Sequence, residues 1–161
     1  TVDILEEYRG RVNLYFNALD NDFASHKNFA KSKCTKDYIF FIDADENVHE
    51  NLLLTLKEVI LNNITVEMFM VPRINVVPGI TQDHIQKWGW QVNDKGYINY
   101  PDPQTRIIVN RPEILWENKV HERLVGHTTH AILPFETEDY CLLHIKDIRR
   151  QESQNNFYNT I

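Results

Sequence analysis

The sequence predicts an α/β fold, an open sheet flanked by helices, and two observations support this prediction. Up to Val71, segments of strand and helix periodicity follow one another in the order strand, helix, strand, helix, strand, which is the rhythm of βαβ units. Residues 38–42 are five consecutive apolar or aromatic residues, and such a run is typical of a strand buried on both faces inside a parallel sheet. We therefore expect ligands to bind beyond the carboxyl ends of these strands.

The composition is that of one globular domain covering residues 1–161. Hydrophobic residues make up 42% and aromatic residues 11% of the 161, which excludes wholesale disorder and collagen-like sequence. The 17 basic and 23 acidic residues give a net charge of −6, which argues against nucleic acid or an anionic membrane surface as a partner. The sequence shows no apolar stretch of membrane-spanning length, no signal-peptide pattern and no metal- or disulfide-type cysteine spacing. We therefore expect a cytoplasmic location.

Four helices are expected from apolar spacing and capping residues. Asp22 is placed to cap a helix that reaches residue 34, and Asn47 with Glu50 forms a capping pair for the next helix. The C-terminal segment is polar and predicts a peripheral helix. The expected helices are residues 2–8, 22–34, 47–63 and 146–161.

Besides residues 38–42, five further strands are expected from apolar runs. They are residues 11–16, 66–71, 106–110, 131–133 and 140–145. Residues 17–21 predict a loop because they hold two Asn and an Asp. The regular pattern fails over residues 72–103, which are rich in Pro, Gly, Trp, Asn and Asp. A loop of this length in a compact domain is either functional or a misread element.

The strand at residues 38–42 stops abruptly at the alternating carboxylates Asp43 and Asp45. One carboxylate at such a strand end can bind a hard divalent cation such as Mg²⁺ or Mn²⁺. The other can accept hydrogen bonds from ribose or sugar hydroxyls. The alternative is that both acids cap the following helix, where its dipole favours negative charge. The buried strand before them favours the functional interpretation.

Glu122 and His144 are two further candidates, each with a simpler alternative. Glu122 can act as a general base in a cleft, or it can be a surface carboxylate paired with Arg123 or Lys119. His144 lies in an apolar strand, where a histidine is more often a hydrogen-bonded core residue than a metal ligand. Position alone favours the simpler alternative for both residues.

Aromatic residues gather in or near the irregular stretch. Among them are the three tryptophans of the chain, Trp88, Trp90 and Trp116. Their faces could floor a sugar-binding cleft, or they could equally fill a core beneath a long loop. With His121 they are the candidates for an acceptor cleft. The sequence lacks the motifs of P-loop, Rossmann dinucleotide, serine-hydrolase and HExxH zinc enzymes.

Taken in order, these segments resemble the family-two glycosyltransferases, which have the GT-A fold. Residues 22–30 look like the family's "dFa..rN.a" helix, and residues 37–46 are very similar to its strand and DxD motif. Residues 100–106 and 116–122 look like the "P..Q.R" and "W.g.VHE" blocks of the subgroup that includes lipopolysaccharide-core glucosyltransferases. His144 stands where GT-A enzymes carry a C-terminal metal-binding histidine. The resemblance implies an open mixed sheet flanked by helices.

The resemblance also implies a donor site. Asp43 would contact the ribose or sugar of a nucleotide-sugar donor. Asp45 and His144 would bind Mn²⁺ or Mg²⁺ at the donor diphosphate, where the metal offsets charge on the leaving group. Gln104 and Arg106 would line the donor cleft, with Arg106 a contact to diphosphate or acceptor.

Glu122 matches the family's catalytic base, which deprotonates the acceptor hydroxyl. The implied function is an inverting, metal-dependent hexosyl transfer to a saccharide, lipid-linked or other hydroxyl acceptor, which could place the protein at a membrane. The alternatives are a non-catalytic sugar- or nucleotide-binding module and a metal-dependent nucleotidyl- or phosphotransferase. Residues 1–5 look like the helix after the family's nucleotide loop, so we expect the first strand–helix–strand portion to be absent and donor binding by this chain to be weak.

Overall fold

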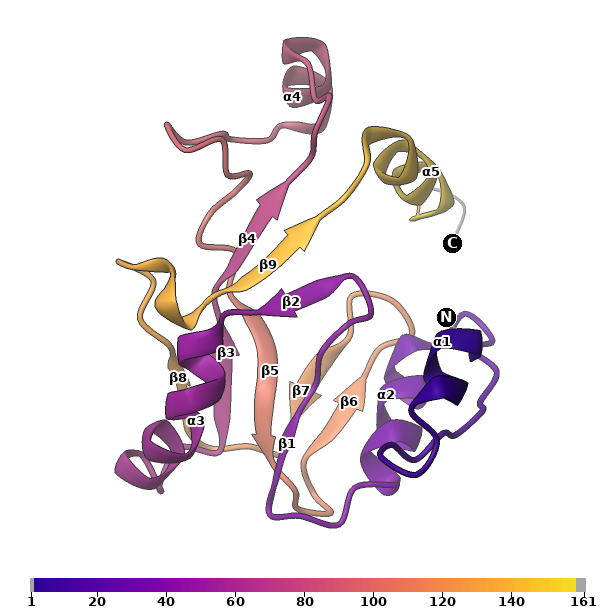
Figure 1. The fold of residues 1–161 in the computed structure, drawn as a ribbon, viewed down its shortest axis with the longest axis vertical. Helices are drawn as coiled ribbons and strands as arrows, with labels where there is room; N and C mark the ends of the chain where they lie inside the picture. Colours follow the sequence, from indigo (N-terminus) through magenta and orange to yellow (C-terminus); the bar gives the residue numbers. More distant parts are fainter. Residues whose placement is uncertain (1, 159–161) are drawn as a thin grey trace. The chain divides into compact units, whose positions relative to one another are not determined.

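The computed structural model describes residues 2–158, which fall into two compact units (Figure 1). Unit 1 combines the N-terminal segment up to Asp37 with Asn110–His127, and unit 2 combines Tyr38–Val109 with the segment from Thr128 onward. That the chain forms one domain stays a prediction. Unit 2 carries the Asp43 and Asp45 carboxylates, and unit 1 carries Glu122.

Unit 2 contains a four-stranded mixed sheet with the strand order β1-β5-β3-β8. Its strands are β1 (Tyr38–Phe40), β5 (Gln104–Val109), β3 (Met68–Val71) and β8 (His130–Ile132). β5 pairs antiparallel with both β1 and β3, whereas β3 and β8 run parallel. The mixed α/β fold expected from the sequence is therefore confirmed, with antiparallel pairs at its centre.

A second sheet in unit 2 has the order β2-β9-β4. Its strands are β2 (Glu46–Val48), β9 (Leu142–Ile145) and β4 (Arg73–Val76). β9 pairs antiparallel with β2 and parallel with β4, and β4 and β9 run side by side in Figure 1. Pro72 separates β3 from β4, so one stretch of chain contributes to both sheets. This arrangement brings the residues after β1 next to β9.

The core of unit 2 lies between these sheets and α3 (Glu50–Asn62). The 3-10 helix η1 (Glu138–Tyr140) packs beside α3, and Tyr140 contacts the core. The fully or nearly fully buried members of this core are Leu52, Phe69, Val71, Ile107, Leu133 and Leu142. Burying such side chains stabilises the fold by about 1.5–3 kcal/mol each.

Two further helices belong to unit 2. α4 (Gln82–Trp88) begins at a capping box made by Thr81 and His84 and ends at Gly89 in the left-handed conformation. α5 (Ile148–Tyr158) confirms the expected polar C-terminal helix, whose last residues, 159–161, lie outside the described residues. No helix within residues 2–158 combines the length and the apolar character that a membrane span requires.

Unit 1 is built from two helices and a hairpin. Its elements are α1 (Val2–Glu7), α2 (Phe23–Ser32), β6 (Leu115–Glu117) and β7 (Arg123–Val125), and β6 and β7 pair antiparallel. Asp22 caps α2 by accepting a hydrogen bond from the Ser25 amide, as expected. Asn28 joins α2 to β6, because its side chain bonds both the N–H and the C=O of Trp116 at 2.9 and 2.8 Å.

The interpretation of residues 38–42 as a strand inside a parallel sheet is wrong. β1 covers only Tyr38–Phe40, pairs antiparallel with β5 and stands at one end of the sheet order. Ile39 is buried and Phe40 half-buried, whereas Ile42 is 47% exposed. Covering both faces of β1 is enough to produce an apolar run, and the run carries no information about the direction of neighbouring strands.

Residues 11–16 do not form the expected strand. Their pairing in the described chain is limited to an isolated bridge between Arg9 and Val12. Tyr15 and Phe16 are exposed, so their apolar character is not explained by burial in a sheet. The capping residue of α3 is also different from the expectation: His49 accepts from the Asn51 amide, because Asn47 belongs to β2.

Residues 72–103 are less irregular than expected, since they contain both β4 and α4. β4 is short and alternates polar Arg73 and Asn75 with apolar Ile74 and Val76, and the neighbouring Pro72 obscured this period-two pattern. The hairpin β6–β7 also went unpredicted, because each of its strands has only three residues.

Gly126 provides a test of the packing of unit 1. It has φ +82°, and a Cβ placed there would overlap the backbone carbonyl of Glu113. We expect Gly126→Ala to lower the free energy of unfolding by considerably more than Gly96→Ala. Gly96 has a matching φ of +81° but open space around it, so alanine there costs only about 1–2 kcal/mol of backbone strain. Urea unfolding of both variants measures the difference, and equal costs would contradict the close approach.

Candidate functional site

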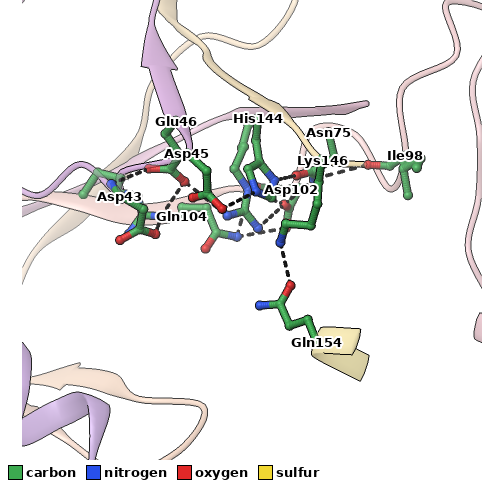
Figure 2. Close-up of polar contacts among 12 residues, drawn as sticks. Asp43, Asp45, Glu46, Asn75, Ile98, Asp102, Gln104, His144, Lys146 and Gln154 are labelled. Atoms are coloured by element: carbon green, nitrogen blue, oxygen red, sulfur yellow. Dashed lines mark hydrogen bonds and ion pairs between the residues drawn. The ribbon is translucent and has the colours of Figure 1, made fainter. Parts of the chain in front are cut away.

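The candidate site of unit 2 is built around the turn between β1 and β2, where Asp43, Asp45 and Glu46 lie (Figure 2). The pairing of β1 with β5 continues past the strand end through a hydrogen bond from the Phe41 amide to the Arg106 carbonyl, 2.8 Å. The chain then turns, and the Glu46 amide donates to the Asp43 carbonyl at 3.0 Å. The turn thus places Asp43 and Asp45 directly before β2, of which Glu46 is the first residue.

The buried side chain of Arg106 holds this turn in place. Its side chain is 3% exposed, and its Nη2 donates to Asp43 Oδ2 at 2.6 Å and to Glu46 Oε1 at 2.5 Å. Burial alone would lower the pKa of Arg106, but the charges of Asp43 and Glu46 outweigh that effect and raise it. Arg106 therefore stays charged and holds Asp43, whose side chain remains 51% exposed.

Glu46 is a member of this cluster that the sequence reasoning missed. Its carboxylate is completely buried, and it accepts from Arg106, from Arg73 Nη1 at 3.2 Å and from the Asp43 amide at 3.1 Å. A buried carboxylate costs free energy unless it is paired and hydrogen-bonded. The signal in the sequence was the position of Glu46 directly after Asp43 and Asp45. The sequence reasoning assigned roles to the two aspartates of the DxD pattern alone.

Asp45 and His144 face one another across the β2–β9 pairing. Asp45 Oδ2 lies 3.5 Å from His144 Nε2, and Figure 2 shows the two side chains converging. His144 is the register partner of Glu46, so the sheet itself brings the histidine beside the turn. Residues separated by about a hundred positions thus meet because β9 lies between β2 and β4.

Positive charges surround Asp45. Arg150 Nη2 lies 3.1 Å from Asp45 Oδ2, and Lys146 Nζ donates to Gln154 Oε1 on α5 at 2.5 Å. Burial alone would raise the pKa of Asp45, but the nearby His144, Lys146 and Arg150 outweigh it and hold that pKa below its usual value. Burial, assisted by the Lys146 charge, lowers the pKa of His144. At neutral pH this pair is therefore a carboxylate beside a neutral imidazole.

A further layer of polar residues connects the turn to His144. Asp102 Oδ2 accepts from Arg73 Nε at 2.9 Å and from Asn75 Nδ2 at 2.6 Å, and Asn75 Oδ1 lies 2.8 Å from His144 Nδ1. Gln104 Nε2 donates to Asp102 Oδ1 at 2.9 Å, so Gln104 belongs to this layer. Sequence reasoning missed Arg73, Asn75 and Asp102, which fall in the stretch expected to be irregular.

The predicted metal ligands come together in part. Within residues 2–158, no three His, Cys, Asp or Glu side chains are grouped so as to hold a metal ion. Asp45 and His144 are nevertheless two side chains with oxygen and nitrogen donor atoms directed at one another. The structure thus brings together five of the predicted site residues: Asp43, Asp45, Gln104, Arg106 and His144.

Glu122 lies in unit 1, and its partner is neither Arg123 nor Lys119. It forms an ion pair with Lys27 of α2, and both side chains are mostly buried. Arg123 instead lies 3.6 Å from Glu117 in an exposed pair. The ammonium of Lys27 also sits 4.3 Å from the ring centre of Trp116. Glu122 is therefore a fixed, partly desolvated carboxylate rather than a free surface acid.

The expected acceptor-cleft residues differ in their surroundings. Trp116 is 4% exposed and belongs to the interior of unit 1, so an acceptor could reach its ring only after a rearrangement. His121 has φ +53° directly before Glu122. In unit 2, Trp88 is half-buried, stacks on His84 at 5.0 Å and lies 4.7 Å from Trp90. A common acceptor cleft for these residues stays a prediction.

A mixed α/β fold with carboxylates and a histidine converging beyond its strands is an arrangement typical of ligand-binding α/β enzymes. The model of glycosyl transferase family 2 matches residues 1–146, and the chain therefore belongs to this family. No curated protein matches the chain. Family membership makes glycosyl transfer the activity of this domain, with a nucleotide-sugar donor and an acceptor as its ligands.

The buried ion pairs of Arg106 make a stability prediction. Arg106→Met leaves Asp43 and Glu46 without their shared partner, so we expect the free energy of unfolding to fall by about 3–5 kcal/mol. Arg123→Met, which removes an exposed pair with Glu117, is the matched control and is expected to cost less than about 1 kcal/mol. Urea unfolding compares the two variants, and similar costs would contradict the structural role of Arg106.

Proposed function

We propose that this domain transfers a sugar, with inversion, from a nucleoside-diphosphate sugar to an acceptor hydroxyl, and that the reaction requires a divalent cation. The observation that carries the proposal is the convergence of Asp45 and His144 at 3.5 Å beside Asp43, in a chain that belongs to glycosyl transferase family 2. Asp43 is the residue proposed to contact ribose or sugar hydroxyls, because half of its side chain is exposed while Arg106 fixes its orientation.

The oxygen and nitrogen atoms that Asp45 and His144 offer as metal ligands fit Mn²⁺ or Mg²⁺. Both ions accept carboxylate oxygens, Mn²⁺ also accepts imidazole nitrogen, and ions of this kind usually take only one or two protein ligands beside phosphate oxygens and water. Asp45 and His144 would hold the ion, and the donor diphosphate would complete its coordination. When bound, the ion supplies neutralisation of the charge that develops on the leaving diphosphate.

Lys146 and Arg150 add positive charge near Asp45. Lys146 is buried and directs its ammonium to Gln154, and Arg150 is largely exposed while it contacts Asp45. Neither Gln104 nor Arg106 reaches outward freely, because both are bonded to carboxylates of the site. We therefore propose that Gln104 and Arg106 support the donor site by positioning Asp43 and Asp102.

Glu122 is proposed as the general base. Its carboxylate would take the proton of the acceptor hydroxyl while the acceptor oxygen forms a bond to the anomeric carbon. The bond from that carbon to the diphosphate oxygen breaks with its electron pair, and the nucleoside diphosphate leaves. Lys27 would hold the Glu122 carboxylate in place before the proton is taken. One displacement of this kind inverts the anomeric configuration.

The sequence blocks around Gln104 and Glu122 support a hexosyl donor and a saccharide or lipid-linked acceptor, with Trp88 and Trp90 as candidate acceptor contacts. A cytoplasmic location, at a membrane where the acceptor is lipid-linked, goes with this proposal. A metal-dependent nucleotidyl- or phosphotransferase would use the same carboxylates, and a non-catalytic module would bind the donor without turnover. The two experiments below separate these alternatives.

Replacing the proposed base tests catalysis. We expect Glu122→Gln to lower kcat by roughly 10²–10⁴-fold, the usual contribution of a positioned base, while the KM for the donor stays unchanged. Glu117→Gln, an exposed carboxylate of the same unit, is the matched control and should leave turnover unchanged. The measurement is release of nucleoside diphosphate from a panel of nucleotide sugars with Mn²⁺. Full turnover by Glu122→Gln would exclude Glu122 as the base.

Thermal unfolding tests donor binding separately. A nucleotide sugar at 100 times its Kd stabilises the folded protein by about 2.7 kcal/mol, so the matching donor should raise Tm in the presence of Mn²⁺. Asp45→Asn should remove most of this Mn²⁺-dependent rise, whereas Asp94→Asn, an exposed acid in a loop of the same unit, should keep it. An equal Mn²⁺-dependent rise in Asp45→Asn and in the unaltered protein would contradict the proposed donor site.

A further inference from the structure

Asn75 lies directly beside His144 on the neighbouring strand. The two residues are register partners in the parallel pairing of β4 with β9. Asn75 is held on its other side by the chain around Ile98, whose amide donates to the Asn75 carbonyl at 3.0 Å. The backbone position of Asn75 is thus fixed from both edges of β4, and its half-buried side chain projects toward the imidazole (Figure 2).

The orientation of the Asn75 amide group follows from its neighbours. The carboxylate of Asp102 already accepts from Arg73 at the oxygen that faces Asn75, so that oxygen is an acceptor. The Asn75 atom 2.6 Å from it must therefore be the NH₂ group, which also points to the Ile98 carbonyl at 3.5 Å. The opposite end of the amide, the atom 2.8 Å from His144 Nδ1, is then the carbonyl oxygen.

This orientation determines which ring nitrogen of His144 carries a proton. A carbonyl oxygen only accepts, so Nδ1 must be the donor in this contact. The conclusion holds for the neutral and the charged ring, because Nδ1 is protonated in both. Nε2 lies 3.5 Å from Asp45 Oδ2, much farther than the 2.8 Å between Nδ1 and Asn75, so the hydrogen bond to Asn75 decides the tautomer. Nε2 is then the ring atom of His144 that is left to bind a cation.

We propose that Asn75, oriented by Asp102, is a positioning residue that keeps the His144 proton on Nδ1 and so presents the Nε2 lone pair to the cation site. The inference rests on the proposed function, since it supplies the reason for a fixed tautomer. A second layer that fixes the ring and the tautomer of a ligating histidine is a general feature of metal sites. Here that layer runs from Arg73 through Asp102 and Asn75 to His144.

The tautomer can be measured directly, without turnover. In protein labelled with ¹⁵N-histidine, long-range ¹H–¹⁵N spectra above the titration of the ring distinguish Nδ1–H from Nε2–H, and His144→Gln assigns the signals. We expect Nδ1–H for His144 in the unaltered protein. Asn75→Leu removes the acceptor, so the proton should move at least in part to Nε2.

Two results would overturn the inference: an Nε2–H tautomer in the unaltered protein, or an unchanged Nδ1–H tautomer in a folded Asn75→Leu variant. If Asn75→Leu does not fold, the spectrum of the unaltered protein still decides the question, because the predicted tautomer is a property of that protein. Thermal unfolding of the Asn75→Leu variant identifies a loss of fold independently of the histidine signals.

Titration with MnCl₂ alone separates this inference from the proposed function. Mn²⁺ bound at Asp45 and His144 should broaden the His144 signals selectively, and Asn75→Leu should weaken the apparent Mn²⁺ affinity by roughly 10- to 100-fold. Absence of selective broadening, with Nδ1–H still observed, would contradict the metal site while the tautomer assignment stands. Selective broadening together with an Nε2–H tautomer would contradict the tautomer assignment while the metal site stands.

Discussion

The buried ion pair between Arg106 and Glu46 is the interaction on which the site depends. Glu46 is completely buried and Arg106 nearly so. Removing either one leaves the other with a single ion pair, to Arg73 or to Asp43, and breaking a buried pair costs about 3–5 kcal/mol. The pair ties β5 to the turn between β1 and β2. Through the same guanidinium it orients Asp43, and through Glu46 it reaches Arg73. The exposed Asp43 carboxylate is therefore positioned from the interior.

Across the whole site, acidic and basic side chains are present in equal number. Four acids, Asp43, Asp45, Glu46 and Asp102, lie among four bases, Arg73, Arg106, Lys146 and Arg150. The inner pairs are buried and hydrogen-bonded, whereas Arg150 is largely exposed. A divalent cation with a doubly charged diphosphate adds no net charge to such a cluster.

The sequence allowed part of this site to be predicted. The carboxylates after a short apolar strand, the apolar strand around His144 and the α2 cap at Asp22 are local features, and the structure has them. Arg73, Asn75 and Asp102 could not be found in the same way, because each is an ordinary polar residue in a stretch without long-range periodicity. Their importance comes from neighbours brought close by strand pairing, and periodicity does not report strand order.

By itself the sequence determined the family resemblance, the mixed α/β character and the residues that bear chemistry, since these depend on residue type and local spacing. Only the tertiary structure decided that β1 pairs antiparallel, that Arg106 is buried beneath Asp43, and that Asn75 stands opposite His144. The physical reason is that a side chain's burial and hydrogen-bond partners are set by which strands become neighbours. That choice is made by the packing of the whole unit, not by any one segment.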